Sequence, residues 1–176
     1  VVPTAPPRPE LPDAEIDTAG FQKAWLEMKD THAFFVIMQQ FRVAREQALR
    51  LAPEGYARRV SSGSTRRMLE AASASGTPIM VFIGNRGCLQ IHTGAVKNIK
   101  MFGDEWLNVL DEDFNMHLRD TAIASAWVVR KPTVDGDVTS LELFDAKGNN
   151  VVIFFGKRKP GEPEDAAWRS ITASLS

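Results

Sequence analysis

The stretch between residues 123 and 156 constrains the fold more than any other part of the chain. It holds three segments rich in β-branched and aromatic residues, IASAWVVRKP, VTSLELFD and VVIFFG. Asp135-Gly136 and Lys147-Gly148-Asn149 separate these segments, and such short glycine-containing connections are typical of hairpins. Strands joined by so few residues run antiparallel. The stretch therefore predicts an antiparallel sheet in the C-terminal part of the chain.

The rest of the pattern places helices before and after further strands. Helical spacing of apolar residues predicts helices over 17–28, 31–40, 43–51 and 64–75. PIMVFI (78–83) and CLQIHTG (88–94) predict a hairpin around the turn GNRG, and short strands are expected at 96–102, 106–110 and 114–118. A last helix is expected after Pro163. This order predicts an α+β fold with a large antiparallel β-sheet and flanking helices.

Composition narrows the class of protein. The net charge of −1 gives no electrostatic case for binding nucleic acid. No apolar run approaches the roughly 20 residues that cross a bilayer, so membrane insertion is not expected. The single cysteine, Cys88, excludes an intramolecular disulfide and suits a reducing compartment, and we expect it to be a small buried apolar residue.

The first residues differ in composition from the remainder. Five prolines fall in the first thirteen residues, VVPTAPPRPELPD. Such a segment is typical of a semi-rigid linker. We therefore expect a proline-rich linker over 1–16 and one domain over 17–176. A chain that begins with such a linker is interpreted as a fragment of a longer protein.

Common catalytic motifs are absent from the sequence: GxGxxG, the P-loop, HExxH, CxxC and GxSxG. Any chemistry then depends on histidine, arginine, lysine or Cys88. His32 stands at the head of an apolar run, in KDTHAFFVIMQQF, where Asp30 and Thr31 can cap a helix. It is either a core or capping histidine, or an axial ligand to haem iron, which needs a neutral imidazole facing an apolar slot. His92 and His117 are interpreted as structural or surface residues.

Basic residues are numerous and dispersed. Arg45 follows His32 by thirteen residues, near the start of the next helix, where a guanidinium can clamp a carboxylate with two hydrogen bonds. Arg130-Lys131 and Lys157-Arg158-Lys159 end two strands. They form either a cationic rim for a ligand with two carboxylates or a solubilising surface cluster.

Several long blocks resemble one family. They are SGSTRRMLEAA (62–72), PIMVFIGNRGCLQIHTG (78–94), VKNIK (96–100), LNVLDEDFNMHLR (107–119), AIASAWVVRKPT (122–133), TSLELFD (139–145) and FFGKRKPGEPE (154–164). The sequence is identified as a member of the cytoplasmic haem-trafficking and hemin-degrading proteins of bacterial haem uptake. These are usually tandem duplications, and this chain resembles the C-terminal repeat.

The resemblance implies a cofactor, haem (iron protoporphyrin IX), and four site residues. DTHAFF matches the motif of the proximal ligand, which falls on His32. Arg45 matches an arginine that lines the haem site, and Lys131 matches a basic residue near the propionates. Phe155 stands where some members have a tyrosine, so a hydrogen bond from that position is lost. The family's distal arginine belongs to the other repeat.

The resemblance leaves three functions open. The first is a cytoplasmic haem carrier in iron acquisition, which takes haem from an inner-membrane transporter and hands it to a haem oxygenase. The second is a haem-degrading enzyme. The third is a docking module that binds no haem by itself. The implied partners are an N-terminal half or a second copy of the chain.

Overall fold

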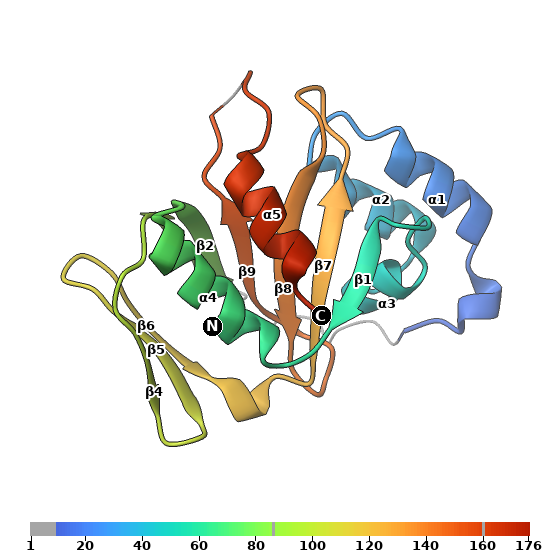
Figure 1. Ribbon diagram of the computed structural model, residues 1–176. Coiled ribbons are helices and arrows are strands. Elements are labelled where there is room, and N and C mark those ends of the chain that lie inside the picture. The colour runs from blue at the N-terminus through green and yellow to red at the C-terminus, as the bar shows by residue number, and fades with distance from the viewer. Residues whose placement is uncertain (1–9, 86, 160) are drawn as a thin grey trace.

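The computed structural model describes residues 10–85, 87–159 and 161–176. Within these ranges, three α-helices open the chain, one strand and a fourth helix follow, and the remaining strands come before a closing helix (Figure 1). The helices are α1 (Thr18–Leu26), α2 (Ala33–Phe41), α3 (Arg45–Arg50), α4 (Ser64–Ser75) and α5 (Ala166–Ser174), with short 3-10 turns η1 (Asp13–Glu15) and η2 (Asp120–Ala122). The strands are β1 (Ala57–Val60), β2 (Ile79–Gly84), β3 (Leu89–Gly94), β4 (Ile99–Phe102), β5 (Trp106–Leu110), β6 (Asn115–Arg119), β7 (Ser125–Lys131), β8 (Val138–Phe144) and β9 (Asn150–Gly156).

Two antiparallel sheets form from these strands. The larger has the order β1-β7-β8-β9-β2-β3, and the smaller has the order β4-β5-β6. The meander β7-β8-β9 is the one expected from residues 123–156, and its strands pair antiparallel. The prediction of an α+β fold with a large antiparallel sheet and flanking helices is confirmed.

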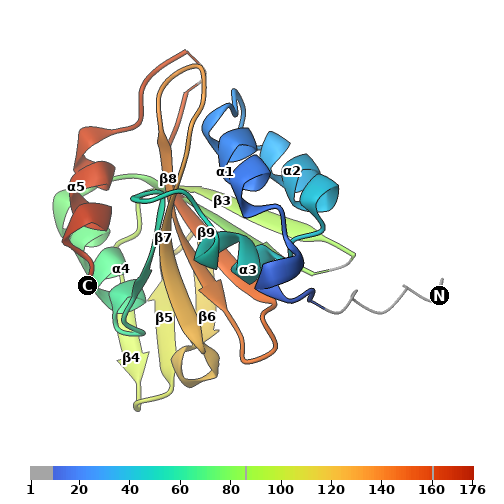
Figure 2. The same cartoon turned by 90° about the vertical axis from the view of Figure 1, so that its right-hand side faces the viewer.

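The large sheet carries helices on both faces (Figure 2). On one face, which we call the α4–α5 face, Leu141, Leu143 and Phe154 are buried in a core that the small sheet also joins. On the other, the α1–α3 face, Val129 and Phe144 pack against α1, α2 and α3. Apolar side chains therefore occupy both faces of one strand, as expected for a sheet covered on two sides.

Residues 10–16 do not stand away from the domain. Ile16 is buried, and Gln47 donates through Nε2 to the backbone oxygen of Leu11 at 2.7 Å. The end of the segment that the composition describes as a linker is thus anchored on α3. Residues 1–9 of the expected linker, and Arg86 in the expected turn GNRG, lie outside the described residues.

The expectation for Cys88 is wrong. The residue precedes β3 at the tip of the β2–β3 hairpin, and it is exposed with a free thiol. Its neighbours on the strand, Leu89 and Ile91, are also more than half exposed. A cysteine in an edge hairpin has no layer above it to bury it, whatever its apolar character.

Candidate functional site on the α1–α3 face

The start of α2 presents His32 to solvent. His32 occupies the N-cap position, and its side chain is 94% exposed. Asp30 accepts from the backbone N–H of His32 at 2.7 Å and lies 2.6 Å from its Nδ1. These hydrogen bonds, the backbone one first, hold the pKa of the Asp30 carboxyl below its ordinary value. Because Asp30 engages Nδ1, the other ring nitrogen, Nε2, is left facing outward.

The outward side of α2 is apolar. Phe35 is 61% exposed and Val36 is 60% exposed, both on the side of the helix that follows His32. Gln39 continues the same side one turn later. We call these four residues, His32, Phe35, Val36 and Gln39, the α2 patch. Exposed apolar side chains beside a histidine make this surface a candidate contact area for a ligand or partner.

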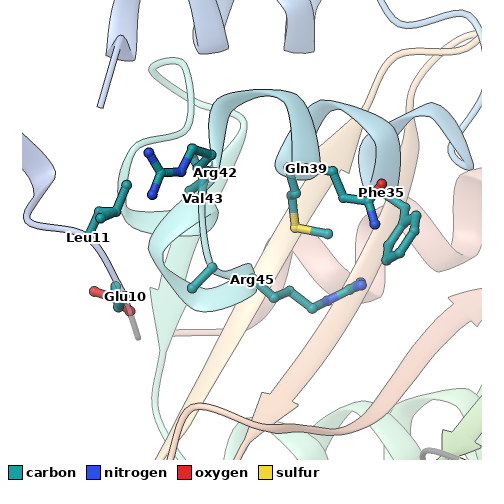
Figure 3. A pocket seen from close by; sticks show the side chains of 9 residues that line it. Glu10, Leu11, Phe35, Gln39, Arg42, Val43 and Arg45 are labelled. Carbon is teal, nitrogen blue, oxygen red and sulfur yellow. The ribbon is translucent and has the colours of Figure 1, made fainter. Parts of the chain in front are cut away.

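A cavity of about 760 Å³ adjoins the α2 patch and runs to the start of α3 (Figure 3). Its volume falls in the range of roughly 300–1,000 Å³ that ligand sites have. Phe35 and Gln39 of the patch line it, together with Glu10, Leu11, Met38, Arg42, Val43, Ala44 and Arg45. Figure 3 shows the Arg45 side chain extended toward Phe35 and Gln39. Two residues of the α2 patch, Phe35 and Gln39, thus border the same hollow as Arg45, while His32 and Val36 are not among its lining residues.

Arg45 belongs to a buried ionic group that the sequence did not reveal. Its Nε and Nη2 each lie 2.9 Å from Oε2 of Glu142, whose side chain is completely buried in β8. Lys131 of β7 donates from Nζ to the other oxygen, Oε1, at 2.6 Å. We call Arg45, Glu142 and Lys131 the ionic triad. It joins α3 to two strands of the large sheet.

The two cations set the charge state of Glu142. Burial raises the pKa of this carboxyl, but the charges of Lys131 and Arg45 outweigh burial and bring the pKa down to about 2. Glu142 is therefore an anion at neutral pH. Ser140 adds a hydrogen bond to Oε1 at 3.1 Å, and Phe34 lies under both cations, with its ring centre 4.7 Å from Lys131 Nζ and 5.7 Å from the Arg45 guanidinium carbon.

The four residues expected at the site do not meet at one point. His32 and Arg45 are linked by the α2 patch and the cavity, whereas Lys131 is enclosed, with its side chain 4% exposed. Arg45 thus lines the cavity, while Lys131 faces Glu142. Phe155 is half-buried on the same face of the sheet and contacts Phe82 edge to face at 5.4 Å, away from the lining of the cavity.

The expected cationic rim divides between two faces. Successive residues of a strand point to opposite sides, so Lys131 joins the ionic triad while Arg130 lies on the α4–α5 face over Tyr56. Among the described residues there is no cluster of three or more His, Cys, Asp or Glu side chains fit to hold a metal ion. Iron in a haem needs one protein ligand only, so a single imidazole such as His32 suffices.

The other two histidines are engaged in structure. His117 Nδ1 lies 2.6 Å from Oδ1 of Asn108 across the small sheet. The His92 ring stacks on Phe114, with ring centres 3.8 Å apart. In contrast to these, the His32 imidazole has its one described hydrogen-bond contact with Asp30 of the same loop.

Comparison with known proteins defines the family. A family model described as the haemin-degrading HemS.ChuX domain matches residues 42–175. The chain belongs to the HemS/ChuX family. Arg45, Lys131 and Phe155 lie inside the matched range, and His32 lies before it. No helix in the described parts of the chain has the length and apolarity needed to cross a membrane.

Relatives in the HemS/ChuX family are about twice as long. The hemin transport protein HmuS of Yersinia pestis is 40% identical over 167 residues, which cover 95% of this chain and 48% of HmuS. The hemin transport protein HemS of Yersinia enterocolitica is 38% identical over 168 residues, again 48% of its length. The chain therefore spans about half the length of the curated relatives it matches.

Solved structures of HemS/ChuX relatives agree with the fold. Holo-PhuS, a heme-binding protein from Pseudomonas aeruginosa, is 49% identical with a TM-score of 0.95 over 99% of this chain and 50% of PhuS. ChuS, an E. coli heme oxygenase, is 42% identical with a TM-score of 0.87 over 91% of this chain and 49% of ChuS. ChuX, 12% identical with a TM-score of 0.71, shares the fold over 95% of its own length.

Proposed function

We propose that this chain binds haem as cargo, with His32 as the ligand to iron, and delivers it to another protein of haem uptake. The observation that carries the proposal is the exposed His32 imidazole with Nδ1 held by Asp30. A histidine that ligates a metal through one nitrogen commonly has the other fixed by a carboxylate. The Asp30 contact therefore prepares Nε2 for iron.

The surroundings of His32 suit a porphyrin. Phe35 and Val36 offer apolar surface beside the imidazole, and Arg45 offers a cation at the border of the adjoining cavity. Haem combines an apolar macrocycle with two anionic propionates, so it needs both kinds of surface. When bound, haem supplies an iron centre that takes axial ligands. The residues of the α2 patch and Arg45 would hold the haem. Lys131 would contribute only indirectly, through the Glu142 carboxylate that it shares with Arg45.

The exposure of His32, the proposed iron ligand, agrees with delivery of haem rather than with its retention. A single protein ligand on an open surface favours release as well as binding. The named relatives HmuS and HemS are hemin transport proteins, which supports the same role here. We propose a haem oxygenase as the recipient, an inner-membrane transporter as the donor, and the cytoplasm as the compartment.

A ferric-haem titration followed by absorbance tests whether His32 ligates the iron. The unaltered chain is expected to give a sharp Soret band that saturates at one haem per chain. His32→Ala is expected to lose this band, whereas the matched control His117→Ala is expected to keep it. Circular dichroism of each variant verifies the fold. Equal spectra from all three proteins would remove His32 from the site, and no specific band in any of them would favour a docking module.

Haem degradation is the second candidate function, because ChuS is a heme oxygenase by name. Incubation of the haem complex with an electron donor and catalase separates the two functions, since catalase removes peroxide that attacks haem without enzymatic help. A carrier keeps its Soret band under these conditions and loses it only when apomyoglobin is added as acceptor. Bleaching in the presence of catalase would establish degradation.

The other half of the longer relatives is the proposed partner. On the α1–α3 face, the outer strands of the large sheet carry exposed Leu89 and Ile91 beside half-buried Phe82. Such an uncovered apolar area suits a second repeat, or a second copy of this chain. Sedimentation of the chain with and without haem distinguishes a monomer from a dimer, and a monomer in both states would leave only the second repeat as partner.

A further inference from the structure

A second cavity, of about 200 Å³, lies on the α4–α5 face of the large sheet. Three of its lining residues are arginines from three different elements: Arg58 of β1, Arg130 of β7 and Arg169 of α5. Asp137 is the one carboxylate among the lining residues that the structure describes. We call it the arginine cavity. The proposed haem site uses none of these side chains.

Arg58 is fixed in place without being neutralised. Its Nη1 donates to the backbone oxygen of Leu175 at 2.6 Å, and its Nη2 donates to that of Thr172 at 2.7 Å. These acceptors are carbonyls at the end of α5, which carry partial charge only. The guanidinium is thereby ordered beside the cavity, and no carboxylate among the described hydrogen-bond partners cancels its charge.

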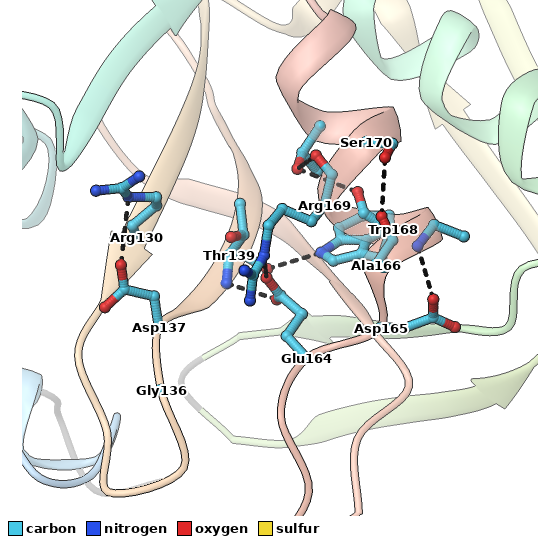
Figure 4. A network of polar contacts seen from close by, with 12 residues as sticks. Arg130, Gly136, Asp137, Thr139, Glu164, Asp165, Ala166, Trp168, Arg169 and Ser170 are labelled. Carbon is cyan, nitrogen blue, oxygen red and sulfur yellow. Dashed lines mark hydrogen bonds and ion pairs between the residues drawn. The ribbon is translucent and has the colours of Figure 1, made fainter.

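Arg130 and Arg169 are paired only loosely. Arg130 Nε lies 3.6 Å from Oδ2 of Asp137, and Arg169 Nε lies 3.8 Å from Oε2 of Glu164 (Figure 4). Both distances exceed those of a hydrogen bond. Glu164 instead accepts from the backbone N–H of Thr139 through Oε1 at 2.7 Å. The guanidinium groups of Arg130 and Arg169 thus have N–H donors that are not hydrogen-bonded to the neighbouring carboxylates.

Charge and size together define what the arginine cavity suits. Three guanidinium groups border it, against the lining carboxylate of Asp137 and the carboxylate of Glu164 beside Arg169, so the cations outnumber the carboxylates by three to two. Guanidinium forks match the oxygens of phosphate with two parallel hydrogen bonds. The volume of about 200 Å³ is below the roughly 300–1,000 Å³ of sites for drug-sized ligands, so the cavity suits a single tetrahedral oxyanion better than a whole nucleotide.

We propose that the arginine cavity is a binding site for an oxyanion of the phosphate class, separate from the haem site. Arg130 and Arg169 supply the donors that change partner on binding, and Arg58 supplies a fixed positive charge. Asp137 is the internal competitor, because its carboxylate forms a loose ion pair with Arg130, at 3.6 Å from Nε.

Calorimetric titration of the unaltered chain with inorganic phosphate at pH 7.5 tests the site, with sodium chloride keeping ionic strength constant. Saturable binding at one phosphate per chain is expected. Arg130→Gln and Arg169→Gln are each expected to weaken it by about tenfold or more, as for the loss of a hydrogen bond to a charged group. The matched control Arg66→Gln, an exposed arginine paired with Glu70 on α4, is expected to have no effect.

Asp137→Asn separates a binding site from a structural network. If Asp137 competes with the anion, this variant binds phosphate more tightly than the unaltered chain, even where the lost ion pair lowers stability. Three results would each overturn the proposal. They are no saturable phosphate binding to the unaltered chain, phosphate binding weakened as much by Arg66→Gln as by the cavity variants, and phosphate binding weakened by Asp137→Asn. Haem titration of the same variants is expected to be unchanged, so a failure of this site does not implicate the haem site.

Discussion

Asp30 Oδ1 lies 2.6 Å from Nδ1 of His32, although both side chains are largely exposed. Exposed ion pairs stabilise folds little. The contact therefore orients the imidazole of His32 and adds little to the stability of the fold. Its two ends belong to one short loop, in which Asp30 also accepts from the His32 backbone, so the ring direction is fixed before α2 begins.

Asp30→Asn tests this orientation. The neutral amide supports the imidazole less strongly, so ferric-haem affinity is expected to fall by roughly 10–100-fold, as for other carboxylates behind metal-bound histidines. Competition titration against a haem-binding reference protein measures the change. Glu27→Gln, at an exposed carboxylate on the preceding turn, is the control. Unchanged affinity in Asp30→Asn would show that Asp30 only shapes the loop.

Arg45→Gln tests whether Arg45 binds the anionic propionates of haem. The unaltered chain is expected to bind haem more tightly than haem dimethyl ester, which lacks charged propionates. Arg45→Gln is expected to lose most of this preference, because the cation at the cavity border is gone. Arg119→Gln, at an exposed arginine on β6 paired with Glu105, is expected to retain it. The measured quantity is the ratio of the two dissociation constants, which a general loss of stability does not alter.

Glu142 makes stability depend on pH in a defined direction. Its pKa is about 2 in the folded chain, below its ordinary value of 4.5, so the folded state favours the charged form. The stabilisation is fully present above pH 4.5 and is lost as the pH falls toward 2. Urea unfolding between pH 7 and 2.5 measures this loss.

Glu142→Gln is expected to lower the free energy of unfolding at pH 7 by about 3–5 kcal/mol, because Lys131 then stays buried without a carboxylate. Its stability is also expected to fall less steeply in acid than that of the unaltered chain. Identical slopes in the two proteins would mean that other carboxylates dominate acid unfolding.

A substitution at Gly156 tests how tightly β9 packs against α5. A Cβ at this residue would lie 2.6 Å from Cγ of Trp168, which is completely buried and donates through Nε1 to Thr139. Since Trp168 has no room to move, Gly156→Ala is expected to destabilise the fold by about 1–3 kcal/mol in urea unfolding. Gly63→Ala, where the nearest atom is the mobile end of Arg67 at 3.4 Å, is the control.

Local patterns in the sequence were enough to predict most elements but not their neighbours in space. The meander β7-β8-β9 follows from turn residues and alternation. The position of β2 beside β9 does not, because that pairing joins segments about seventy residues apart. Strand β1 also went unpredicted, since Arg58 and Arg59 make it polar and tertiary contacts, chiefly its pairing with β7, order it.

The candidate site shows the same limit. The position of His32 at a helix start was visible from its neighbours, and Asp30 was visible as a possible cap. Glu142 was not visible, because a glutamate between Leu141 and Leu143 has the pattern of a solvent-facing residue. Its burial results from α3 and β7, which bring Arg45 and Lys131 to it from distant parts of the chain.

The alternation of β7 has a consequence for insertions and deletions. Arg130 and Lys131 are adjacent, yet one borders the arginine cavity and the other lies in the ionic triad. A shift of the strand by one residue would exchange their faces and disrupt both groups at once. An insertion or deletion within β7 is therefore expected to disrupt both groups, while a substitution at either residue acts on one face alone.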